Sequence, residues 1–76
     1  MPNKMNVIQG LKALVNMGVD LRAYWREVKI GEVNLPDGLD GIHDIIMNAC
    51  RELAEAGEGR TPTEVLLAYI DRATKI

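Results

Sequence analysis

Residues 39–56 read LDGIHDIIMNACRELAEA, and their apolar side chains recur every three to four positions. This spacing places the apolar side chains on one face of an α-helix. Asp40 and Asp44 lie in the first turns, where carboxylates interact favourably with the helix dipole. Gly57-Glu58-Gly59 then ends the pattern. The sequence predicts a long central helix whose apolar face is made of Leu39, Ile42, Ile45, Ile46, Ala49, Cys50 and Leu53.

Two shorter helices are expected before this central one. The first covers about residues 6–17, with Asn6 as its N-cap and Gly18 as a left-handed stop. The second covers about residues 21–28 and has Asp20 as its N-cap. Its apolar residues follow the i, i+3, i+4, i+7 pattern of a half-buried helix, namely Leu21, Tyr24, Trp25 and Val28.

A fourth helix begins at Thr61-Pro62-Thr63-Glu64. Threonine caps the helix, proline suits the first helical position, and the glutamate completes a capping box. Between the second and third helices, residues 28–35 alternate imperfectly around Gly31, which predicts a short extended arm or a small hairpin. The expected fold is therefore all-α, a single helical domain over residues 1–76 with three or four helices.

Composition narrows the class of protein. The chain has 76 residues, of which 47% are hydrophobic, and this fraction is too high for a disordered protein. Cys50 is the only cysteine, so neither an intrachain disulfide nor a cysteine-based zinc site is available. No apolar run is long enough to cross a bilayer, and the N-terminus does not read as a signal peptide. A cytoplasmic location is expected.

The charge is divided unevenly along the chain. Residues 1–31 carry five basic and two acidic residues, whereas residues 32–76 carry four basic and nine acidic ones. Such asymmetry can indicate a nucleic-acid-binding face, or two halves of the chain that attract each other.

Residues 11–26, LKALVNMGVDLRAYWR, place Gly18 in a tight turn between two helices. This stretch resembles the helix–turn–helix of bacterial repressors and excisionases, with Gly18, an apolar residue and a cap between the helices. The resemblance implies that the second helix contacts DNA, with residues 29–38 as a wing. The sequence departs from that family at Leu14, where a small residue is usual. The second helix also lacks Asn, Gln, Ser and Thr to read base edges.

No catalytic constellation emerges from the sequence. His43 and Cys50 lie two helical turns apart, roughly 10 Å along the axis, which is too far for proton transfer. They are also the only histidine and cysteine, so they do not form a metal site of common geometry. We expect no enzymatic activity, no metal and no cofactor.

Two functions fit these observations. The favoured one is a small non-enzymatic protein-interaction or assembly module, of the kind found among bacterial and phage accessory factors, which acts on a protein partner or on itself. The alternative is a helix–turn–helix DNA-binding regulator that uses the basic second helix. For either, the expected partner or DNA contacts are Arg22, Trp25, Arg26 and Lys29. The broad apolar surface of the fourth helix further predicts a homo-oligomer that associates through Val65, Tyr69 and Ile70.

Overall fold

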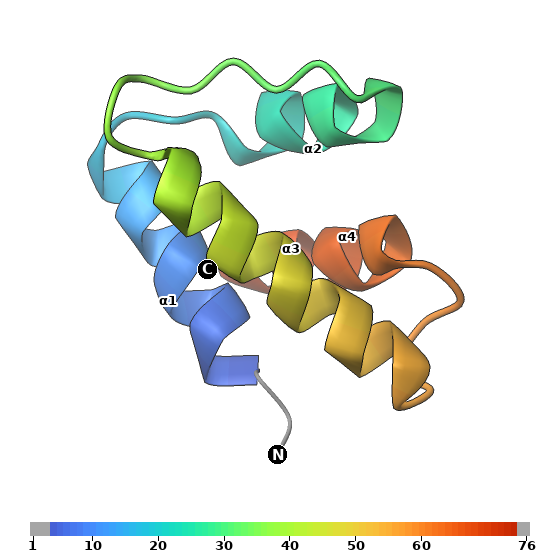
Figure 1. Cartoon of the computed structure of the whole chain (residues 1–76). Helices are drawn as coiled ribbons and strands as arrows, with labels where there is room; N and C mark the ends of the chain where they lie inside the picture. The colour runs from blue at the N-terminus through green and yellow to red at the C-terminus, as the bar shows by residue number, and fades with distance from the viewer. Residues whose placement is uncertain (1–3, 75–76) are drawn as a thin grey trace.

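The computed structural model describes residues 4–74 and confirms an all-α fold. Four helices follow one another, α1 (Lys4–Asn16), α2 (Leu21–Ile30), α3 (Asp40–Glu55) and α4 (Pro62–Thr74). α3 packs against both α1 and α4, and α2 lies across one end, where it contacts α4 and α1 (Figure 1). The central position expected for the third helix is therefore confirmed.

The core is mainly aliphatic and includes two tyrosines. Its members have at most 5% of their surface exposed, and they are Val7, Leu11, Leu14, Leu21, Tyr24, Leu39, Ile46, Ala49, Cys50, Leu53, Val65, Leu66, Tyr69 and Ile70. The predicted apolar face of α3 is confirmed except at Ile45, which is 51% exposed. Successive residues of an α-helix are about 100° apart, so Ile45 lies beside the buried face that Ile46 occupies, and half of its surface stays in solvent.

Local capping explains where α2 begins. The Asp20 carboxylate accepts hydrogen bonds from the backbone N–H groups of Arg22 (3.0 Å) and Ala23 (3.4 Å), as the sequence predicts. Gly18 ends the preceding helix with a φ of 85°, a left-handed conformation that glycine adopts without steric cost. The predicted N-cap at Asn6 is wrong, because α1 already begins at Lys4 and Asn6 lies inside it.

Residues 28–35 form neither a hairpin nor any strand within the described chain. Val28 to Ile30 continue α2, and Gly31 ends the helix with a φ of 76°. The following loop runs back alongside α2 to the start of α3 (Figure 1). Its backbone is held by a side chain rather than by a second strand, since the N–H of Asn34 donates to Glu27 Oε1 at 2.9 Å.

The start of α4 confirms the predicted cap at Thr61, whereas Glu64 bonds the residue before the cap and not the N-cap N–H of a capping box. The N–H of Glu64 donates to Thr61 Oγ1 at 3.3 Å, and the Glu64 carboxylate accepts from the N–H of Arg60 at 3.2 Å. Within residues 4–74, no helix combines the length and the apolar character that crossing a bilayer requires.

Candidate functional site

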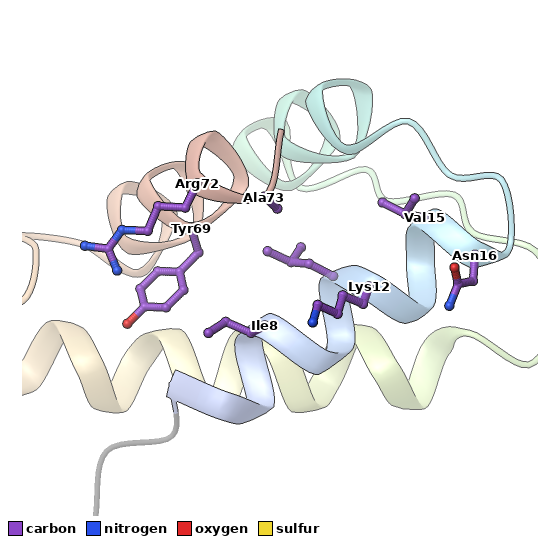
Figure 2. A pocket seen from close by; sticks show the side chains of 8 residues that line it. Ile8, Lys12, Val15, Asn16, Tyr69, Arg72 and Ala73 are labelled. Carbon is purple, nitrogen blue, oxygen red and sulfur yellow. The ribbon is translucent and has the colours of Figure 1, made fainter. Parts of the chain in front are cut away.

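An open groove of about 440 Å³ lies between α1 and α4. Figure 2 shows the side chains that line it, which come from these two helices only. They are Ile8, Leu11, Lys12, Val15, Asn16, Tyr69, Arg72 and Ala73. Because Ile8 and Val15 lie two turns apart on α1, the groove offers an apolar strip roughly 10 Å long.

The groove has an apolar floor and a basic rim. Leu11 and Tyr69 form buried parts of the floor, while Val15 is 52% exposed to solvent. Lys12 and Arg72 stand on the two sides, and none of the lining side chains is a carboxylate. The surface therefore suits an occupant that combines apolar side chains with negative charge.

Two contacts fix the wall that α4 contributes. Tyr69 Oη donates to Glu58 Oε1 at 3.2 Å, and the Arg72 guanidinium lies 5.2 Å from the centroid of the Tyr69 ring. Burial, together with the Glu58 carboxylate, raises the pKa of Tyr69, so the phenol stays neutral at physiological pH. Glu58 also forms an ion pair with Lys4 at 3.4 Å, which joins the loop before α4 to the start of α1.

The basic residues predicted as contacts lie exposed along α2, but two of them already have partners. Arg22 forms an ion pair with Asp71 of α4 at 3.1 Å. Lys29 Nζ lies 4.3 Å from the centroid of the Trp25 ring. The half-buried Trp25 donates its indole N–H to the backbone oxygen of Thr63 at 3.1 Å. Trp25 thus ties α2 to α4.

The residues predicted for self-association are not on the surface. Val65, Tyr69 and Ile70 are 1%, 3% and 0% exposed, because α4 is covered on several sides by the chain's own helices. The prediction that these three side chains form a self-association contact is therefore wrong. Only Tyr69 borders the groove, and its ring forms part of the floor.

His43 and Cys50 both have structural roles, His43 in a contact with Tyr24 and Cys50 in the core. Tyr24 Oη lies 2.8 Å from His43 Nδ1, and the two rings meet edge to face, which joins α2 to α3. Cys50 is fully buried, and burial raises the pKa of its thiol to about 11. Within residues 4–74, no group of three or more metal-ligating side chains comes together.

The groove itself was missed by sequence reasoning. Its α1 side belongs to a stripe of apolar residues whose spacing predicts a buried helix face. Only the width of that stripe, from Ile8 to Val15, indicated that part of it is exposed. Its α4 side depends on Arg72 and Ala73, which have no distinctive pattern.

Comparison with known proteins identifies no relative of this chain. No protein-family model matches the sequence, and neither a curated protein nor a solved structure does so. The function is therefore inferred from the chain's own surface.

Proposed function

We propose that this chain is a non-enzymatic protein-interaction module that binds an acidic amphipathic helix in the groove between α1 and α4. The observation that carries the proposal is the combination of an open apolar strip with Lys12 and Arg72 on its rim. Helix-in-groove recognition reads apolar anchors at i, i+3 or i+4, and i+7 on the partner. A strip of two helical turns matches that spacing.

Exposure on α1 supports this choice of surface. Val15 keeps half of its surface in solvent although it lies on the wall of a groove, where a partner side chain would cover it. Lys12 lies one turn before it, and within the described chain it has neither an ion pair nor a hydrogen bond. A partner helix with an acidic residue beside an apolar one would contact both Lys12 and Val15.

The DNA-binding alternative has less support. Its basic residues do share one exposed face of α2, but Arg22 is paired with Asp71, and Lys29 lies over Trp25. Trp25 is held in place by α4 and not presented as a free contact. Binding to DNA phosphates is stronger when several basic side chains are free to contact them. Of the three basic residues on α2 named as DNA contacts, Arg26 alone has no partner within the described residues.

A peptide-display selection tests the proposed function. Random helical peptides selected on the intact protein are expected to converge on apolar residues at helical spacing flanked by Asp or Glu. Val15→Glu is expected to weaken binding of the selected peptides by at least about tenfold, because it places a carboxylate in the apolar strip.

Ile30→Glu is the matched control. Ile30 is 69% exposed at the end of α2 and does not line the groove, so the same new charge there is expected to leave peptide binding unchanged. Equal losses for both variants, or enrichment of basic peptides, would contradict the proposal.

A further inference from the structure

We infer that the occupant of the groove is α3 of a second copy of this chain, so that copies associate head to tail. The inference rests on the proposed function, because it identifies the acidic helix that the groove receives. It is carried by the exposed side of α3, which combines one exposed isoleucine with acidic side chains, whereas the groove is apolar with a basic rim.

Ile45 is the apolar anchor on this face. It is 51% exposed, although its neighbour Ile46 is fully buried. Gly41 lies one turn earlier, and a Cβ added there would meet nothing within 4 Å, so packing inside the chain does not require glycine at this position. A missing side chain beside an exposed isoleucine lets another helix approach Ile45 closely.

The charges along the exposed side of α3 complement the rim of the groove. The exposed acidic residues of α3 outnumber its single arginine, Arg51, and they are Asp40, Asp44, Glu52 and Glu55. Within residues 4–74, none of these four carboxylates forms an ion pair. Lys12 and Arg72 of a second copy are cations that match them.

The two surfaces lie on different sides of the molecule. α3 packs its buried face on α1 and α4, while the groove between these two helices contains no residue of α3 (Figure 2). One molecule can therefore offer its groove to one neighbour and its α3 to another, which is a heterologous contact. A symmetric contact of groove with groove is disfavoured, because two rims that each carry Lys12 and Arg72 would bring like charges together.

Analytical ultracentrifugation of the intact protein tests the inference. At low salt, the weight-average mass is expected to rise with concentration past twice the monomer mass of 8.4 kDa, and to fall when salt is added. Lys12→Glu with Arg72→Glu is expected to weaken association by at least about tenfold, and so is Asp44→Lys with Glu52→Lys. An equimolar mixture of these two double variants is expected to associate again and to exceed the mass of a dimer. The intact groove of one variant meets the intact α3 of the other, and at the next contact the exchanged charges are complementary.

Ile30→Glu is the control here too, and it is expected to associate like the wild-type chain. Circular dichroism of each variant establishes that its helices form. A mass that stays at the monomer value up to millimolar concentration, or that stops at the dimer, overturns the inference. If selected peptides still bind the groove of such a monomer, the proposed function stands and only the second copy is excluded as its partner. If the selected peptides ignore the groove, the proposed function itself fails.

Discussion

Replacing Ile46 by alanine is expected to lower the free energy of unfolding by about 2–5 kcal/mol. Ile46 is fully buried where α3 faces α1, so the truncation removes apolar contacts and leaves a cavity. A chain of this size has a total stability of roughly 4–11 kcal/mol, so the loss is a large part of it. Urea denaturation followed by circular dichroism measures it.

The adjacent Ile45 provides a matched control for this prediction. The same substitution, Ile45→Ala, is expected to change the stability of the monomer by no more than about 0.5 kcal/mol, because the side chain is half exposed. Comparable losses for the two variants would show that α3 is rotated relative to the core. Measurement at low protein concentration keeps association out of the comparison.

Cys50 is expected to react with Ellman's reagent at pH 8 at least about a hundredfold more slowly in the native chain than in urea. The thiol is fully buried, so the reagent reaches it only when the structure opens. Burial also raises the pKa of the Cys50 thiol to about 11, which lowers the fraction of reactive thiolate. Equal rates in the two conditions would exclude Cys50 from the core.

The same pKa predicts how stability depends on alkaline pH. The unfolded chain ionises its thiol near the ordinary cysteine pKa, whereas the folded chain holds the proton until about pH 11. Stability from this group is therefore complete below the ordinary pKa, and it is lost as the pH rises toward 11. Burial raises the pKa of Tyr24 as well, and this acts in the same direction at still higher pH. Cys50→Ala is expected to flatten the fall between about pH 9 and pH 11.

The helices were predictable because their signals are local. Asp20, Gly18 and the Thr61 cap act within one turn of the chain, and the structure uses all of them. Residues 28–35 were harder to predict, because apolar residues around a glycine fit both a hairpin and the end of a helix. Gly31 decides this by taking the left-handed conformation that stops α2.

The groove between α1 and α4 was not predictable, because it depends on how the helices pack together. Gly10 allows α1 to approach α3 so closely that an added Cβ would lie 2.5 Å from Ile46 Cγ1. The sequence places Gly10 inside a predicted helix, but it does not show that another helix packs against this position. The packing that follows buries Val65 and Ile70 and leaves Val15 exposed on the groove. The surface that we propose for contacts therefore includes only Tyr69 of the three residues expected on α4.

Amide chemical-shift mapping by NMR is the most direct test of the groove as the contact surface. When a peptide selected on the intact protein is added to the ¹⁵N-labelled chain, the amides of Ile8, Lys12, Val15 and Ala73 are expected to shift most. Shifts concentrated on Arg26, Lys29 and Ile30 of α2, with the groove amides unchanged, would contradict this assignment.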